Sequence, residues 1–201
     1  MPGDDRPFGT AILSLFDCHR DGEEAEREDD RRRFQGRLKA LGIAYKSLHV
    51  GPDGTIGLNL SGTPIADLVP LTALPLTRLC LQGCYGIADF SPLREMKLTW
   101  LNLCRTRVKD LSPLARLALS HLDLHRTRAA DLRPLKRVPL RSLAIRFSRI
   151  TNLSPLKGMP LEELSFYPGR ITRGLGALRG IGSLKTINRR SSEAFWERHD
   201  P

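Results

Sequence analysis

The sequence has few cysteines, and they follow no recognised pattern. Cys18, Cys80, Cys84 and Cys104 form no C-x-x-C pair and no dense framework of the kind that crosslinks small secreted domains. This spacing argues against a disulfide scaffold. Free thiols in a reducing compartment fit best, so we expect a cytoplasmic protein.

Long apolar runs are also missing. No stretch approaches the roughly 20 apolar residues that a helix needs to span a bilayer, so we expect no association with a membrane. The short apolar segment Phe8–Phe16 follows Asp4 and Asp5 and is followed by the charged Asp17 and His19. It therefore lacks the basic start and the small-residue cleavage site of a secretory signal peptide.

Charge is distributed unevenly along the chain. The net charge is +10, yet residues 1–33 contain ten acids and six bases, which leaves 26 bases and 12 acids, a net charge of +14, for the remainder. Such asymmetry fits an acidic partner such as a nucleic acid. It fits equally a soluble surface with its own intramolecular counter-charge, and we favour this second interpretation.

An internal repeat of 21 or 22 residues organises most of the sequence. Residues 98–118 read L-T-W-L-N-L-C-R-T-R-V-K-D-L-S-P-L-A-R-L-A, and the same apolar pattern recurs before and after them. The units start at Leu76, Leu98, Leu119, Leu140 and Leu161. One unit is too short to bury its own apolar face, so neighbouring units are expected to stack around one continuous core.

Each unit predicts a strand, a turn and a short helical segment. The L-x-x-L-x-L pattern alternates as a strand does, and a small Thr, Cys or Ser three residues later turns the chain inside the stack. Ser-Pro-Leu, as in 112–114, then predicts a helix start with Ser as the cap and Pro in the first turn. Successive strands joined in this way must be parallel, about 4.8 Å apart.

The two ends of the chain depart from the repeat. We expect residues 1–20 to be a flexible segment and residues 21–54 to form an N-terminal cap, with a helix over 21–41 and a hairpin that turns at 51–54. Phe34, Leu38 and Leu41 share one face of that helix and are expected to dock on the first repeat.

The repeats are then expected to fill residues 55–182, and residues 183–201 to form a C-terminal cap. Within that cap, residues 184–187 predict a last strand, and residues 191–196 predict a capped helical turn whose Phe195 and Trp196 cover the open end of the core.

The strand pattern followed by D-L-S-P-L, as in residues 110–114, resembles leucine-rich repeat proteins, and most of all their bacterial class with 21 or 22 residues per repeat. Residues 183–198 also look like the end of bacterial repeat regions, some of which are appended to serine/threonine kinases. The likeness covers roughly residues 48–198. Asn152 and Arg133 depart from the Asp and Ser of the other units, which is expected to weaken single turns only.

The resemblance implies an α/β fold: a leucine-rich repeat solenoid, or horseshoe, with a concave parallel β-sheet, short helical turns on the convex side and a cap at each end. It also implies a role in protein binding. No Gly-rich loop with its lysine and no H-R-D segment is present, so a kinase role would require a kinase in trans.

The candidate binding residues occupy strand positions that alternate with the buried leucines, and thus face the concave side. Rigid strands that present mixed polar and aromatic side chains suit the recognition of a protein surface, whereas an idle solvated face is the alternative. The candidates are Arg78, Trp100, Asn102, His121, Asp123, His125, Arg146 and Tyr167.

A metal site and a catalytic site were considered on the same face and rejected. His121 and His125 are about 13 Å apart along a strand, too far for both to bind one zinc ion with Asp123 or Cys104. A nucleophilic Cys104 beside His125 would need oxyanion donors and a pocket that the sequence does not indicate. We therefore expect no enzyme activity, no metal and no cofactor.

Arginines recur just beyond the strands and are expected to form a basic stripe: Arg105, Arg107, Arg126, Arg128, Arg149 and Arg170. Beside Trp100, Phe147 and Tyr167, such a stripe can follow phosphates while bases stack on the rings. The alternative is that each arginine is solvated or pairs with an acid.

These observations predict a non-enzymatic, monomeric module that binds a protein through its concave sheet and basic edge. An acidic partner would match its charge. Binding of RNA or single-stranded DNA through the arginine stripe is the second hypothesis.

Overall fold

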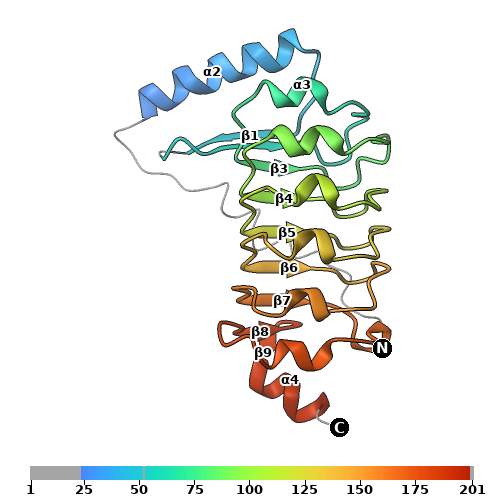
Figure 1. The fold of residues 1–201 in the computed structure, drawn as a ribbon. Helices are drawn as coiled ribbons and strands as arrows, with labels where there is room; N and C mark the ends of the chain where they lie inside the picture. Colours follow the sequence, from blue (N-terminus) through green and yellow to red (C-terminus); the bar gives the residue numbers. More distant parts are fainter. Residues whose placement is uncertain (1–23, 52, 200–201) are drawn as a thin grey trace, which may run out of the picture.

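The computed structural model describes residues 24–51 and 53–199, which form a single stack of repeats with a different structure at each end (Figure 1). Our expectation for residues 1–20 lies outside the described residues. The strands are β1 (Ser47–Val50), β2 (Ile56–Asn59), β3 (Arg78–Cys80), β4 (Trp100–Asn102), β5 (His121–Asp123), β6 (Ser142–Ala144), β7 (Glu163–Ser165), β8 (Thr186–Ile187) and β9 (Arg190–Ser191).

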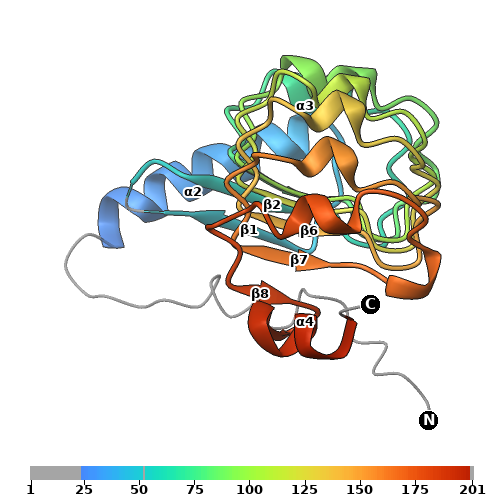
Figure 2. The ribbon, with the colours of Figure 1, turned by 60° about the horizontal axis from the view of Figure 1, so that its bottom comes forward.

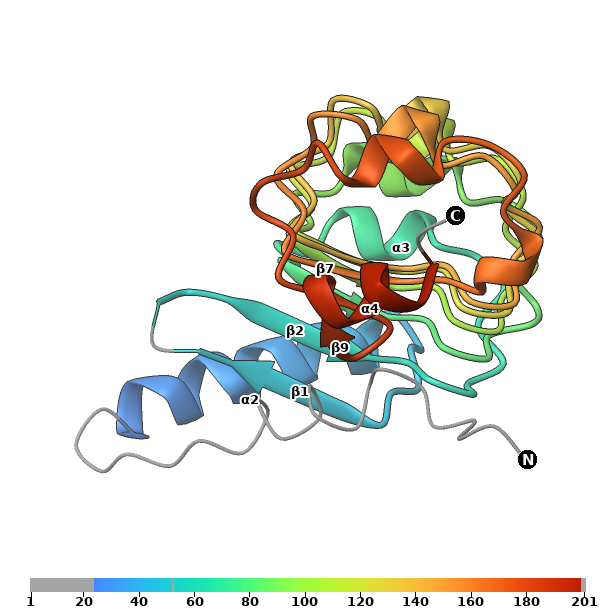
Figure 3. The same cartoon turned by 90° about the horizontal axis from the view of Figure 1, so that it is seen from below.

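The helices are short except for the first. They are α2 (Glu24–Ala40), α3 (Val69–Thr72), α4 (Ser192–His199) and the 3₁₀ turns η2 (Ser91–Glu95), η3 (Ser112–Leu114), η4 (Arg133–Leu135), η5 (Ser154–Leu156), η6 (Pro168–Arg170) and η7 (Leu175–Leu178). Figure 3 looks along the stack and shows α3 and most of these turns on the side of the coil opposite the strands, whereas η6, which follows β7, lies at the flank of the coil.

The strands form one sheet in sequence order, and β2 to β8 run parallel. Leu79, Leu101, Leu122 and Leu143 pair in register on adjoining strands and are all buried. This confirms the predicted leucine-rich repeat solenoid. Because each unit shares its core with its neighbours, burial is continuous along the stack.

Buried hydroxyls turn the chain after β4, β5 and β6, as predicted. The Thr106 and Thr127 side chains donate to the carbonyls of Leu103 and Leu124, three residues earlier, at 2.7 and 2.8 Å. Ser148 does the same with Ile145 at 2.7 Å. A small hydroxyl fits inside the coil and satisfies a carbonyl that the turn would otherwise leave unpaired.

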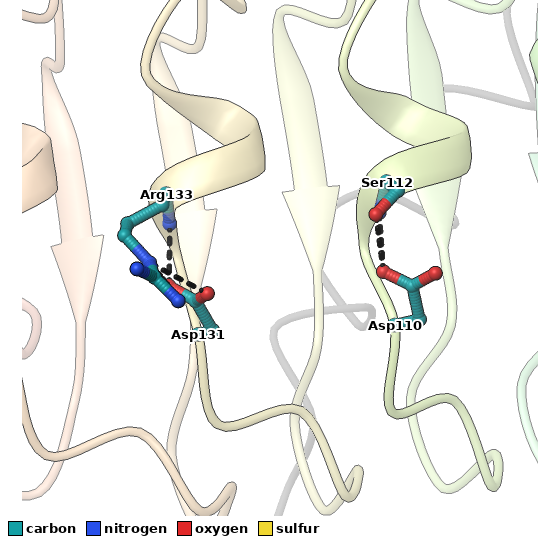
Figure 4. A network of polar contacts seen from close by, with 4 residues as sticks. All are labelled: Asp110, Ser112, Asp131 and Arg133. Atoms are coloured by element: carbon teal, nitrogen blue, oxygen red, sulfur yellow. Dashed lines mark hydrogen bonds and ion pairs between the residues drawn. The ribbon is translucent and has the colours of Figure 1, made fainter.

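The predicted cap of each 3₁₀ turn was wrong. Ser112 lies in the turn itself, and the aspartate two residues before it accepts the bond, since Asp110 Oδ1 receives the Ser112 N–H at 2.8 Å. In the next unit Asp131 accepts from the Arg133 N–H at 2.9 Å and from the Arg133 Nε at 2.8 Å (Figure 4). The repeat that has Arg133 in place of serine therefore keeps the same turn. Asn152 likewise accepts from the N–H two residues on.

The helix α2 covers the N-terminal end of the stack. Phe34 and Leu38 are buried, as predicted, but Leu41 is exposed. The reason is that α2 ends at Ala40 and Gly42 adopts φ +65°, so that the Gly42 and Ile43 N–H groups donate back to Lys39 and Leu38. This Schellman motif reverses the chain before Leu41 can reach the core.

The other end is closed by a hairpin and a helix. β8 and β9 are antiparallel, joined by Asn188 and Arg189, which both have positive φ. Ser191 Oγ accepts the Ala194 N–H at 3.2 Å and so caps α4. The Phe195 ring is buried and meets Phe166 edge to face, 5.7 Å between centroids. The predicted strand and capped turn are present, and Phe195 covers the core as expected.

Among the described residues, no helix has both the length and the apolar character needed to cross a membrane.

Candidate protein-binding surface

The predicted binding residues of β3 to β5 lie in rows across the sheet. Arg78 pairs with Trp100, and Trp100 with His121, in one row, while Asn102 pairs with Asp123 in another. We call the side of β3 to β7 that points away from the helical turns the outer sheet face (Figure 2). His125, Arg146 and Tyr167 follow directly after the strands, so they lie at the edge of this face.

These residues differ widely in exposure. Tyr167 is 50% exposed, and Arg78, His121 and Arg146 are half-buried. Trp100, Asn102, Asp123 and His125 are buried; the Trp100 ring is only 8% exposed and lies 5.4 Å from the Arg78 guanidinium. Arg146 and Tyr167 at the edge are therefore more accessible than Trp100, Asn102 and Asp123 in the strands.

Asp123 stands where the repeats of β2 and β4 have asparagine. Asn59, Asn102 and Asp123 each accept, through Oδ1, the N–H of the residue two positions later, at 2.8 to 2.9 Å. Burial raises the pKa of Asp123 to about 6, and the bond from the His125 N–H opposes part of that rise. A carboxyl in this position keeps the local turn and adds a group that titrates near neutral pH.

The thiols of the outer sheet face are poor nucleophiles. Burial raises the pKa of Cys104 to about 12, and the nearby Asp123 adds to the rise. Burial likewise raises the pKa of Cys80 to about 11. Both thiols stay protonated at neutral pH, so the pairing of Cys104 with His125 does not supply a thiolate.

Histidines of this region offer no cluster for a metal ion. His121 bonds to the hydroxyl of its neighbour Ser120 at 2.8 Å, and burial lowers its pKa. Within residues 24–51 and 53–199, no three His, Cys, Asp or Glu side chains are arranged to hold a metal.

A left-handed backbone position recurs at the edge of the face. Gly62 and Gly83 occupy it in the first two repeats, and Arg105, Arg126 and Phe147 occupy it in the next three, all with φ between 55° and 70°. Such a conformation costs an L-residue roughly 1–2 kcal/mol, whereas glycine adopts it freely. Three successive repeats therefore carry a side chain at a position where the backbone favours none.

Aromatic and cationic groups gather at this edge. The Phe147 and Tyr167 rings stack at 6.3 Å, and the guanidiniums of Arg126 and Arg146 lie 5.4 and 5.6 Å from the Phe147 ring. The His125 ring meets Phe147 edge to face at 5.3 Å. We call these five residues the edge cluster. Phe147 is 43% exposed, so the cluster offers a partly exposed aromatic surface with two cationic groups against it.

Sequence reasoning placed Phe147 beside the arginine stripe but did not include it among the binding residues. Its alignment with Gly83 was the available signal, because a large side chain in a glycine position must point out of the turn.

The arginine stripe is partly formed. Arg107, Arg128 and Arg149 are exposed at equivalent positions, and the Arg128 and Arg149 N–H groups bond to the preceding unit. Arg170 instead lies in η6, and its guanidinium donates to the Ser148 carbonyl at 3.2 Å. The α2 helix packs on β1 rather than over this stripe.

Two stripe residues line a groove beside the helical turns. The groove holds about 430 Å³ and is bordered by Arg94, Arg107, Lys109 and Arg128, together with the exposed Tyr85. Asp89 and Asp110 also line it, but their oxygens bond to Ser91 and Ser112, which lowers their pKa values. The groove is a mainly cationic surface with two aromatic residues, Tyr85 and Phe90.

Comparisons with known proteins bear on the fold. No family model matches the chain, and no curated protein matches its sequence. Among solved structures, an internalin C2 from Listeria monocytogenes is 28% identical, with a TM-score of 0.62, over 76% of this chain and 70% of that one.

A second similar structure is an internalin (inlF) from the same organism, 25% identical with a TM-score of 0.54, over 66% of this chain and 46% of that one. The likeness to repeats appended to kinases is not tested by these comparisons and stays a prediction. The chain is a leucine-rich repeat solenoid whose structural neighbours are Listeria internalins.

Proposed function

We propose that this chain is a non-enzymatic module that binds a protein partner through the outer sheet face and its basic edge. Leucine-rich repeat solenoids present extended surfaces that serve protein binding, and the internalin-like fold supports this class of function. The observation that carries the proposal is the edge cluster, in which two exposed stacked rings lie together and two guanidiniums contact one of them, Phe147.

The chemistry of the edge cluster favours a partner with carboxylates next to apolar side chains. Arginine, tyrosine and other aromatic residues supply most of the binding energy in protein interfaces. The rings offer apolar area, and Arg126 and Arg146 each offer a forked set of donors for a carboxylate. An acidic partner also complements the net charge of +14 on residues 34–201.

The test is affinity capture from the organism of origin, followed by titration of the captured protein. We expect Phe147→Ala with Tyr167→Ala to weaken binding about tenfold or more. Tyr85→Ala is the matched control, because Tyr85 is 58% exposed but lies in the groove beside the helical turns. A partner that binds the double variant as tightly as the unmodified chain would contradict the proposal.

Nucleic-acid binding is the second candidate, and the cationic groove with Arg107 and Arg128 favours it. Fluorescence anisotropy with labelled single-stranded RNA and DNA at low salt tests this candidate. It predicts an affinity that falls steeply with salt and weakens with Arg128→Glu or Arg149→Glu. Unchanged anisotropy at low salt would remove it.

A further inference from the structure

The groove beside the helical turns lies where one repeat is a residue longer than those that follow it. Tyr85 and Gly86 together occupy the place that Arg107 fills in the next unit and Arg128 in the unit after that. Gly86 lets the longer turn lie close against the preceding unit, because a Cβ there would be only 3.1 Å from the Ile65 carbonyl oxygen. Tyr85 is left 58% exposed in the lining of the groove.

Small residues keep the groove open. Ala88 stands at the position equivalent to Lys109 in the preceding unit, and Ala130 stands there in the following unit. An alanine in each neighbouring unit leaves space around the lysine side chain. The resulting groove of about 430 Å³ falls within the roughly 300–1,000 Å³ that is typical of small-ligand sites.

Positive charge dominates this groove. Four exposed cationic side chains line it: Arg94, Arg107, Lys109 and Arg128. Within residues 24–51 and 53–199, the ion pairs are formed by cations other than these four. Four cations and the two acids of the lining leave a net charge of +2, which attracts an anionic ligand.

Both acids of the groove are already engaged in the turns that they cap. Asp89 accepts the N–H and the hydroxyl of Ser91 at 2.8 and 2.7 Å. Asp110 accepts the same two groups of Ser112 at 2.8 and 2.5 Å. These carboxylates are therefore held toward the serines, and the arginines remain the groups that can bind a ligand.

We propose that this groove binds a nucleoside diphosphate or triphosphate, with the base stacked on Tyr85 and the phosphates held by Arg107 and Arg128. A planar base stacks well on an exposed tyrosine ring. The forked donors of a guanidinium match the oxygens of a phosphate. Tyr85 and Arg128 are two repeats apart, or about 10 Å, so that one ligand of this kind can contact both.

This inference goes beyond the proposed function, because no residue of the edge cluster lines the groove. It also differs from the binding of a nucleic-acid strand. A strand would follow the whole arginine stripe, including Arg149, whereas the groove involves three repeats and ends at Arg128.

Isothermal titration calorimetry of the full chain with ATP at low salt tests the proposal. Arg107→Ala with Arg128→Ala is expected to weaken binding at least tenfold, because it removes both guanidiniums that hold the phosphates. Arg149→Ala is the matched control, since Arg149 is exposed at the equivalent position of the next repeat but does not line the groove. It is expected to change the affinity less than twofold.

Inorganic tripolyphosphate, which has the phosphates but no base, tests the role of the aromatic ring. We expect it to bind at least fivefold more weakly than ATP. Tyr85→Ala is expected to weaken ATP binding about fivefold and to leave tripolyphosphate binding unchanged. The unchanged binding of tripolyphosphate would also show that the groove of this variant is intact.

Three outcomes would overturn the proposal. The first is no detectable binding of ATP, or binding that the double arginine variant retains. The second is tripolyphosphate binding as tight as that of ATP, which would indicate a general anion site. The third is an equal loss of ATP affinity in Arg149→Ala, which would indicate phosphate contacts along the whole stripe. No protein partner enters these measurements, so their outcome is independent of the proposed function.

Discussion

The first two repeats and the three that follow have different residues at the same left-handed turn position. Gly62 and Gly83 take the left-handed position without cost, while Arg105, Arg126 and Phe147 take it with side chains in place. In both groups the N–H at this position extends the hydrogen bonding between repeats, as in Gly83 to Cys104 at 2.9 Å and Arg105 to His125 at 2.8 Å.

This comparison shows that the stacking of repeats, and not the residue type, determines the backbone conformation at the turn. The central repeats accept backbone strain and also bury a carboxyl at Asp123, and the edge cluster lies on those same repeats. The backbone strain, the buried carboxyl and the proposed binding surface therefore fall on the same repeats.

The largest expected effect tests whether the two groups share one core. Leu79→Ala in an early repeat and Leu122→Ala in a central one each remove a buried leucine from the same column, so each is expected to cost about 3 kcal/mol. Urea unfolding of both variants measures this. A second transition in either variant, or a urea m-value well below that of the unmodified chain, would show that the groups do not unfold as one unit.

Asp123→Asn tests the cost of the buried carboxyl, with Asn102 as the natural example of the replacement. The pKa of Asp123 is raised from 3.8 to about 6 in the folded chain, so the folded state binds the proton more tightly than the unfolded state. Asp123 therefore lowers stability as pH rises from about 4 to 6, and the penalty is fully present above pH 6.

Asparagine at position 123 keeps the acceptor for the His125 N–H and removes the charge. A pKa shift from 3.8 to about 6 corresponds to about 3 kcal/mol, so the variant is expected to be about 3 kcal/mol more stable at pH 7.5 and little different at pH 4. Unfolding free energies of both proteins across this range check the prediction. Parallel pH profiles would contradict it.

Gly83→Ala gives an early repeat a side chain at the left-handed position, as the central repeats have. A Cβ at Gly83 would find its nearest neighbours 4.0 Å away, so there is space, and the cost arises from φ of +70° alone. We expect a loss of about 1 kcal/mol in thermal or urea unfolding. Gly36→Ala, in the helix α2 where nothing lies within 4 Å, is the control and is expected to stabilise the chain.

Arg105→Gly makes the reverse change and is expected to have the smallest effect. Relief of the left-handed strain, partly offset by the greater flexibility of glycine in the unfolded chain, leaves a gain of about 0.5 kcal/mol. Phe147→Gly is the contrasting variant, because it also loses the contacts of the edge cluster. A gain in stability for Phe147→Gly would show that those contacts contribute nothing.

The repeated part of the fold could be predicted from the sequence because every unit has the same apolar spacing, which fixes the register of its strand. The pairing of Leu79 with Leu101, and of Leu101 with Leu122, follows from the period alone. The two ends of the chain have no repeated pattern of this kind. The exposure of Leu41 depends on Gly42 stopping the helix, and the β8–β9 hairpin turns on Asn188 and Arg189 rather than on a typical Asn-Gly pair.

The candidate site was predictable in position but not in accessibility. Alternation along the strands correctly placed Trp100 and His121 in one row on the outer sheet face. It could not indicate that Trp100 is buried, since alternation gives the direction of a side chain and says nothing of what covers it. The edge cluster depends on ring geometry around Phe147, which no spacing rule encodes.

The two hairpins at the ends of the sheet have a consequence for how the molecule can change in size. β1 and β9 run against the direction of the strands between them, and α2 and α4 pack beside them. A further parallel unit joined at either end would meet a reversed strand, so the stack can lengthen only from within. Duplication of residues 119–139 would add one repeat, which lengthens the sheet by about 4.8 Å, and would leave both terminal hairpins in place.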